Sequence, residues 1–145
     1  MSAAVRRPAR LPAKATLPIG LDSSCCHEFL ADSDRADLFA AAIENTAALV
    51  VPVMPVYEVT KKLAREAGEE VAAAALSLMH RGQVIAVDLP LAVRAAANGL
   101  PLAESLIYAT AQACNADLWT QNSHFEGLAG VRVFVKPQPL KATAR

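Results

Sequence analysis

The chain has 145 residues, which is enough for one domain with a real hydrophobic core. Its formal net charge is zero, and its three cysteines, an odd number, do not suggest the disulfide framework of a small secreted protein. No apolar run is long enough to cross a bilayer, and no apolar signal segment follows the arginines near the start. We therefore predict a soluble protein of the cytoplasm.

The zero net charge hides an uneven distribution of charged side chains. The segments before residue 15 and after residue 135 together carry seven basic residues and no acid, whereas residues 15–135 carry seven basic and fourteen acidic residues. The body is thus about seven charges negative, and a purely electrostatic nucleic-acid binder more often has a basic body. An acidic body suits a metal site or a basic protein partner. We predict a folded domain over residues 16–136, with flexible basic extensions at 1–15 and 137–145.

Strands and helices are expected to alternate along the folded part. Strands are predicted over residues 17–22, 48–53, 84–89, 117–121 and 131–135. Helices are predicted to begin at Ser23 or Ser24, around the apolar set Leu38, Phe39, Ala42 and Ile43, and at Pro55, Glu69, Leu91 and Pro101. This alternation favours an α/β fold, with a mainly parallel sheet covered on both faces.

Three carboxylates and one amide are predicted at a single edge of this sheet. Asp22 and Asn122 lie at the ends of predicted strands, and Glu58 and Glu104 lie in the first turns of predicted helices. Ligands of open α/β sheets bind outside the carboxyl ends of the strands, so the four side chains can meet in one crevice. Hard oxygen ligands of this kind suit Mg²⁺ or Mn²⁺. Taken singly, a carboxylate in the first turn of a helix can also serve only the helix dipole.

Three stretches resemble a PIN domain of the VapC toxin type, over about residues 18–136. They are GLDSS with Glu28 six residues after Asp22, then VPVMPVYEV, then GLPLAESLIYATAQACNADLWTQNSHFEGLAGVRVF. The resemblance implies a PIN-like three-layer α/β/α fold with a mainly parallel sheet of about five strands. It also implies an endoribonuclease (a hydrolase) that uses Mg²⁺ or Mn²⁺, acts on RNA, forms a homodimer and is held inactive by a VapB-type antitoxin.

The same resemblance implies which residues form the site. The catalytic residues would be Asp22, Glu58, Glu104 and Asn122, with metal ligands Asp22, Glu104 and Asn122 and supporting residues Ser23 and Ser24. Two positions depart from the family pattern, in which the third and fourth residues are usually Asp. The extra methylene of Glu104 moves its carboxylate by roughly 1 Å, and the amide of Asn122 brings no charge. The alternative is therefore a catalytically weakened PIN domain that acts mainly as an antitoxin-binding module.

Basic residues near the predicted site are candidates for contacts with RNA. Lys61, Lys62 and Arg65 follow Glu58 at spacings that place them on its helical face. Alternatively, these bases form a solvent-facing surface that includes a Glu58–Lys62 ion pair, since runs of charged residues on helices generally face solvent. His124, in the loop after the fourth site residue, is also within reach of a substrate.

Two other functions fit the sequence less well. Cys25, Cys26 and His27 are adjacent and lack the spacing of a structural zinc site, so packing is the favoured role of the cysteines. A receiver-like signalling domain with Asp22 as phosphoacceptor would need an acidic pair near the first strand, and LDSS lacks that pair.

Overall fold

The computed structural model describes residues 18–30 and 34–136. The two predicted basic extensions, residues 1–15 and 137–145, lie outside this part, so the boundaries of the folded domain stay predictions. Within the described residues, no helix combines the length and the apolar character that a membrane span requires.

The described elements alternate between strands and helices along most of the chain. The strands are β1 (Ile19–Leu21), β2 (Leu49–Pro52), β3 (Gln83–Ile85), β4 (Asp117–Thr120) and β5 (Val131–Val133). The helices are α1 (Ser23–Leu30), α2 (Ala36–Glu44), α3 (Val53–Ala67), α4 (Glu69–His80), α5 (Leu89–Ala96) and α6 (Leu102–Ala113), with short 3-10 helices η1 (Thr46–Ala48) and η2 (Ser123–Phe125).

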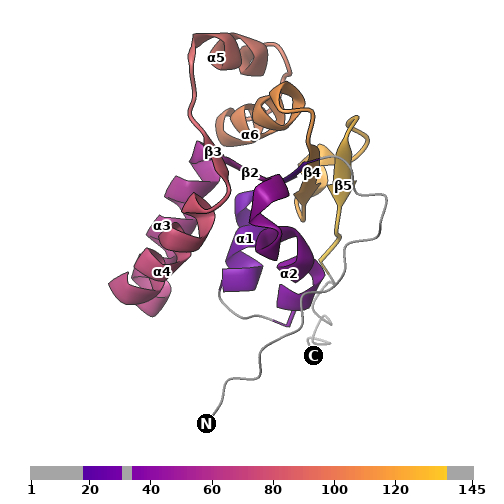
Figure 1. Cartoon of the computed structure of the whole chain (residues 1–145). Coiled ribbons are helices and arrows are strands. Elements are labelled where there is room, and N and C mark those ends of the chain that lie inside the picture. The colour runs from indigo at the N-terminus through magenta and orange to yellow at the C-terminus, as the bar shows by residue number, and fades with distance from the viewer. Residues whose placement is uncertain (1–17, 31–33, 137–145) are drawn as a thin grey trace, which may run out of the picture.

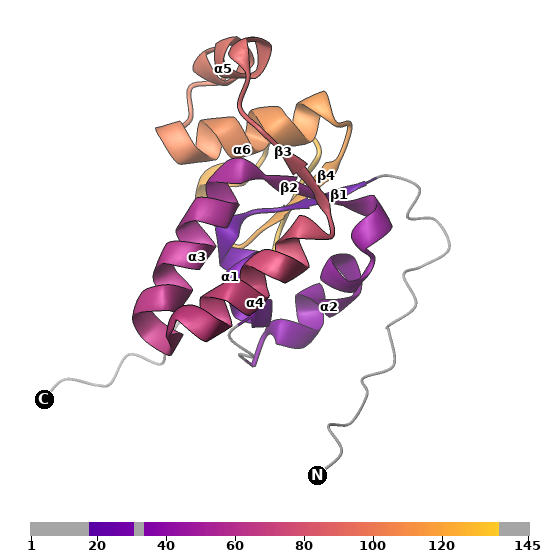
Figure 2. The same ribbon diagram turned by 60° about the vertical axis from the view of Figure 1, so that its left-hand side comes forward.

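The strands form one five-stranded sheet in the order β3-β2-β1-β4-β5, and every pair is parallel. Helices α1 to α4 lie on one side of the sheet and α5 and α6 lie on the other (Figures 1 and 2). The predicted three-layer α/β/α fold with a parallel sheet is therefore confirmed. The central strands β1 and β2 are buried along their whole length, as a sheet covered on both faces requires.

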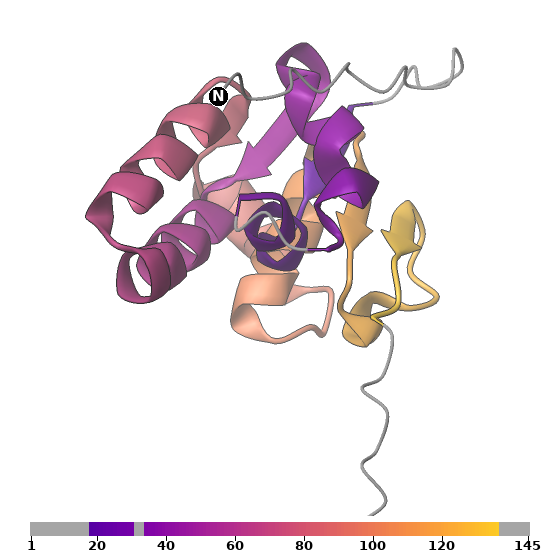
Figure 3. The ribbon, with the colours of Figure 1, turned by 90° about the horizontal axis from the view of Figure 1, so that it is seen from below.

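Each face of the sheet has its own hydrophobic core. Phe39 on α2 and Leu63 on α3 are fully buried on the face covered by α1 to α4. Leu118 on β4 and Phe125 on η2 are fully buried in a second cluster with residues of α6. Viewed from below, α1 lies between α2 and the α3–α4 pair (Figure 3), and it contacts both α2 and α3. Helix α1 is thus held from two sides directly behind the carboxyl end of β1.

Several element boundaries differ from the prediction by one to four residues, and two of the differences have identifiable reasons. Helix α3 begins at Val53, so Pro55 is its third residue and not its first. Proline is accepted there because the first N–H groups of a helix have no intrahelical partner. Strand β3 ends at Ile85, and Asp88 caps α5 by accepting a hydrogen bond from the Leu91 N–H at 2.9 Å. The predicted end of that strand therefore belongs to the start of a helix.

Candidate active site

Asp22 directly follows β1 and is the most buried carboxylate of the predicted site, with 4% of its surface exposed. Its Oδ1 accepts hydrogen bonds from the Ser24 N–H at 3.0 Å, the Ser24 hydroxyl at 2.5 Å and the Cys25 N–H at 3.4 Å. Asp22 therefore takes the capping role that the sequence suggested for Ser23 or Ser24. The helix dipole favours a negatively charged side chain at a helix N-terminus, so the position of Asp22 before α1 suits a carboxylate.

Two residues at the end of β4, which sequence reasoning missed, fix Asp22 and Ser24 from the neighbouring strand. The hydroxyl of Thr120 donates a short hydrogen bond to Asp22 Oδ2, and it accepts one from the Asn122 N–H at 3.0 Å. The Gln121 side-chain amide donates to the Ser24 carbonyl at 3.3 Å. In the sequence, these two residues are marked only as a polar pair directly before Asn122. Their contact with Asp22 and Ser24 depends on the pairing of β1 with β4, which joins residues almost a hundred positions apart.

Glu104, Asn122 and His124 form a second hydrogen-bonded group. The Asn122 amide nitrogen donates to Glu104 Oε1 at 2.7 Å, and its Oδ1 accepts from the His124 N–H at 3.0 Å. Reversing the amide would set two oxygens against each other, so this network fixes its orientation. The His124 ring nitrogen Nδ1 lies 3.0 Å from Glu104 Oε1 and 3.2 Å from Oε2. Asn122 and His124 thus hold the carboxylate of α6 at the end of β4.

Glu58 lies in the second turn of α3 and not in the predicted first turn, because the helix begins at Val53. It also differs from the other acids in its hydrogen bonding. Its Oε1 is buried and has no hydrogen-bond partner among the described residues. Burial raises the pKa of Glu58, the Ser23 hydroxyl lowers it, and the negative charges of Asp22 and Glu104 raise it again. Asp22 and Glu104 are therefore each near enough to Glu58 for their charges to act on it.

The donor set fits a hard divalent cation by its chemistry. Carboxylate oxygens are the preferred ligands of Mg²⁺ and Mn²⁺, and the buried Oε1 of Glu58 is an acceptor without a donor. Within the described parts of the chain, however, no three His, Cys, Asp or Glu side chains come close enough together to hold a metal ion. In the described structure the carboxylate of Glu104 instead contacts Asn122 and His124.

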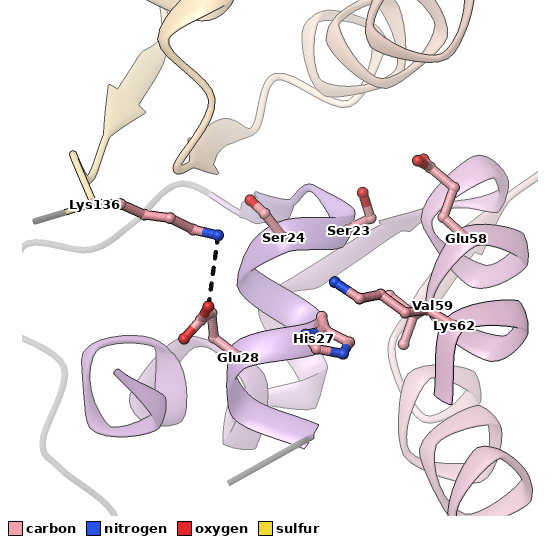
Figure 4. Close-up of a pocket in the computed structure, with 8 residues that line it drawn as sticks. All are labelled: Ser23, Ser24, His27, Glu28, Glu58, Val59, Lys62 and Lys136. Atoms are coloured by element: carbon pink, nitrogen blue, oxygen red, sulfur yellow. Dashed lines mark ion pairs between the residues drawn. The ribbon is translucent and has the colours of Figure 1, made fainter. Parts of the chain in front are cut away.

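A cavity of about 280 Å³ adjoins the acidic group, between α1 and α3 (Figure 4). It is lined mainly by polar side chains, among them Ser23, Ser24, His27, Glu58, Lys62 and Lys136. Of the bases predicted to contact RNA, only Lys62 lines it. In the described part of the chain, no ion pair joins Lys62 to Glu58.

The other predicted RNA contacts are distributed around the site. The Lys61 ammonium lies 3.2 Å from the Tyr57 hydroxyl, on an exposed part of α3. Arg65 is exposed near the end of α3. His124 is largely exposed, with 64% of its side-chain surface accessible, and it borders the carboxylate of Glu104. The two lysines that adjoin in sequence therefore have different surroundings.

The sequence matches the PIN domain family over residues 19–131. The chain belongs to this family, and the match runs from the first residue of β1 to the first residue of β5. A search among curated proteins found no significant match.

Solved structures with the same fold include several toxin–antitoxin proteins. A toxin–antitoxin complex from Klebsiella pneumoniae has a TM-score of 0.67 at 22% identity, covering 79% of this chain and 96% of that one. DNA-bound VapBC from Salmonella typhimurium has a TM-score of 0.60 at 19% identity, covering 82% and 98%. VapC20 from Mycobacterium tuberculosis, a sarcin–ricin loop cleaving toxin, has a TM-score of 0.57 at 15% identity, covering 74% and 91%. At these identities the likeness establishes the fold.

Proposed function

We propose that the protein is an endoribonuclease toxin of a toxin–antitoxin pair, and that it hydrolyses RNA phosphodiester bonds with a bound Mg²⁺ or Mn²⁺. The observation that carries the proposal is the gathering of Asp22, Glu58 and Glu104 at one edge of a PIN-family sheet, with an unpartnered buried oxygen on Glu58. The similarity to VapC20, described as a toxin that cleaves the sarcin–ricin loop, supports RNA as the substrate.

Each site residue has a role in this proposal. Asp22, Glu104 and Asn122 are the proposed metal ligands, and Glu58 completes the catalytic group. When bound, a divalent ion supplies an activated water and neutralises charge on the scissile phosphate. Ser24 and Thr120 hold the two oxygens of Asp22 in one orientation, and Ser23 lies beside Glu58.

Basic side chains around the acids are proposed to bind the RNA strand. Lys62 and His124 border the acidic group from two sides, and Lys61 and Arg65 extend the positive surface along α3. Phosphate contacts of this kind position a nucleic acid without reading its sequence. They offset the negative charge of the acidic body, which would otherwise repel RNA.

The proposed protein partner is a VapB-type antitoxin, and the proposed assembly is a homodimer in the cytoplasm. Three of the structures with this fold are toxin–antitoxin complexes, and two of them are bound to DNA. The acidic body of the chain fits a basic inhibitory segment of such a partner.

A second function is favoured by the hydrogen bonding of Asn122. Its amide nitrogen faces Glu104 and its oxygen faces the His124 N–H, so this side chain adds no charge to the acidic group. A domain with such a site would cleave RNA weakly and act mainly by binding its antitoxin, and through it DNA.

The test is RNA cleavage by the purified protein with Mn²⁺ or Mg²⁺, compared with EDTA and with the Asp22→Asn variant. Metal-dependent cleavage that Asp22→Asn abolishes supports the nuclease. Absence of cleavage by the native protein, together with cleavage by Asn122→Asp, supports the binding module.

A further inference from the structure

The cavity between α1 and α3 is a feature that the acidic group does not explain. Pockets for drug-sized ligands begin at about 300 Å³, and this cavity of about 280 Å³ is smaller and mostly polar. It therefore suits a small polar group rather than a whole nucleotide. Its wall includes the Ser23 hydroxyl, the His27 imidazole and the ammonium groups of Lys62 and Lys136.

Lys62 is a cation of the cavity wall that forms no ion pair within the described residues. Lys136 faces Glu28 at 3.7 Å, which is an ion pair longer than a hydrogen bond, and Lys136 is 57% exposed. Glu58 belongs to the acidic group at one end of the cavity. Figure 4 shows the Lys62 side chain extending from α3 toward α1, with Glu58 one helical turn away. No ion pair involving Lys62 occurs within the described residues.

Glu58 and Lys62 lie on successive turns of α3, with Cβ atoms about 5–6 Å apart, and both line the cavity. An RNA strand whose scissile phosphate lies at the acidic group can therefore continue past Lys62. We propose that the cavity binds the RNA phosphate next to the scissile one, through Lys62 and Lys136. This inference rests on the proposed nuclease function, which places the scissile phosphate at the acidic group.

Ser23 connects the two subsites. Its hydroxyl lies beside Glu58, whose pKa it lowers, and it also lines the cavity. A strand that crosses from the acidic group to Lys62 therefore passes a hydroxyl donor at the N-terminus of α1, where the helix dipole also favours a phosphate. The ring of His27, which also lines the cavity, contacts Glu66 of α3 at 3.3 Å and so links α1 to α3 beside the subsite.

The test measures binding of a short fluorescein-labelled oligouridylate by anisotropy, in EDTA, over a series of KCl concentrations. Lys62→Gln is expected to weaken binding about tenfold, the equivalent of one charged hydrogen bond. It is also expected to reduce the slope of log K against log salt by about 0.7, the value for one phosphate contact with a single strand. Lys136→Gln should act in the same direction with a smaller effect, because Lys136 also pairs with Glu28.

Two variants serve as controls. Lys62→Arg keeps the charge and should keep the salt slope. Arg81→Gln removes the same charge between α4 and β3, at the amino edge of the sheet, and should leave binding unchanged. Equal thermal unfolding midpoints of the variants would exclude a folding defect. In cleavage assays, Lys62→Gln should raise KM and leave kcat unchanged, because the phosphate that it contacts is not the reacting one.

Four results would overturn the proposal. Equal effects of Lys62→Gln and Arg81→Gln on binding would indicate only a general dependence on charge. If Lys62→Gln binds RNA as the native chain does and loses affinity only for the antitoxin, the cavity belongs to an acidic side chain of that protein. If the native protein cleaves RNA and Lys62→Gln has the same KM, only the cavity proposal fails. If the native protein neither binds nor cleaves RNA, the proposed function fails with it.

Discussion

Asp22 accepts four hydrogen bonds from α1 and β4, whereas the buried Oε1 of Glu58, in the same acidic group, accepts none within the described residues. The strand ends of a parallel sheet are fixed relative to one another, so donors from two chain segments converge on Asp22. Glu58 lies on a helix and depends on rotations about its own side-chain bonds. The comparison shows one carboxylate whose position the fold determines, and another that has an acceptor left for a ligand.

Removing the charge of Asp22 should have the largest effect. Asp22→Asn keeps most of the shape and hydrogen bonding at this position, so we expect a folded protein. RNA cleavage should fall by roughly 1000-fold, as expected when a main electrostatic group is lost. Initial cleavage rates with Mn²⁺ measure the change, and circular dichroism checks the fold. A variant that retains more than a tenth of the activity would show that Asp22 is not a metal ligand.

Converting Asn122 into an acid should remove the hydrogen bond that holds Glu104. The position of Glu104 would then be less well fixed than that of Asp22. Asn122→Asp replaces a donor 2.7 Å from Glu104 Oε1 with a second carboxylate, so the two should repel each other in EDTA and lower the Tm. Added Mn²⁺ should bind about tenfold more tightly than to the native chain, which corresponds to about 1.4 kcal/mol. Thermal unfolding over a Mn²⁺ series measures both effects. An unchanged Tm in EDTA would contradict the Glu104–Asn122 hydrogen bond.

Loosening Asp22 should have an intermediate effect. Thr120→Val removes the hydroxyl that donates to Asp22 Oδ2, and loss of a hydrogen bond to a buried charged group costs about 1–3 kcal/mol. Thr110→Val is the matched control, because Thr110 is equally buried and its hydroxyl donates to the Leu106 carbonyl within α6 at 2.7 Å. Both variants should be less stable in urea, but only Thr120→Val should also weaken Mn²⁺ binding. If Thr120→Val and Thr110→Val bind Mn²⁺ equally well, Thr120 has no role in metal binding.

Neutralising Glu58 should have the smallest effect, and it should stabilise the protein, whereas the preceding two substitutions should destabilise it. The folded-state pKa of Glu58 is raised by burial, so its ionisation destabilises the folded protein as pH rises through that pKa. In EDTA, Glu58→Gln should therefore raise the Tm at neutral pH, and this gain should vanish below the usual glutamate pKa of about 4.3. Glu126→Gln, at an exposed position, should show no such dependence. A gain of equal size at both pH values would mean that charge burial is not its cause.

The fold, and the placement of Asp22 and Asn122 at one edge of the sheet, followed from local features of the sequence. Short apolar runs such as ALVVPV indicate strands, and the alternation with helices indicates a parallel sheet, which brings Asp22 and Asn122 to the same edge. The boundary at Asp88 was misjudged because an acid can end a strand or cap a helix, and only the hydrogen bond to Leu91 decides between them.

The contacts within the site depend on packing that the sequence does not specify. Thr120 reaches Asp22 across 98 residues of sequence, and the pairing of β1 with β4 makes that contact. Lys61 and Lys62 are the same residue type at adjacent positions, and the packing of α1 against α3 determines which one faces the cavity. The resemblance to the PIN family suggested which residues gather at the site, but it did not suggest that Asn122 donates to Glu104.

The two thiols of α1, which follow Asp22 in the chain, make chemical labelling a probe of this region. Cys25 and Cys26 on α1 are buried, and burial raises the pKa of both thiols, that of Cys26 to about 12, so neither reacts readily in the folded state. Cys114, which is partly exposed, provides an internal reference for the labelling rate. The alkylation rate of the α1 pair therefore reports how often this helix opens under native conditions. A ligand that bridges α1 and α3 will slow that rate, whereas one that binds elsewhere on the sheet will not.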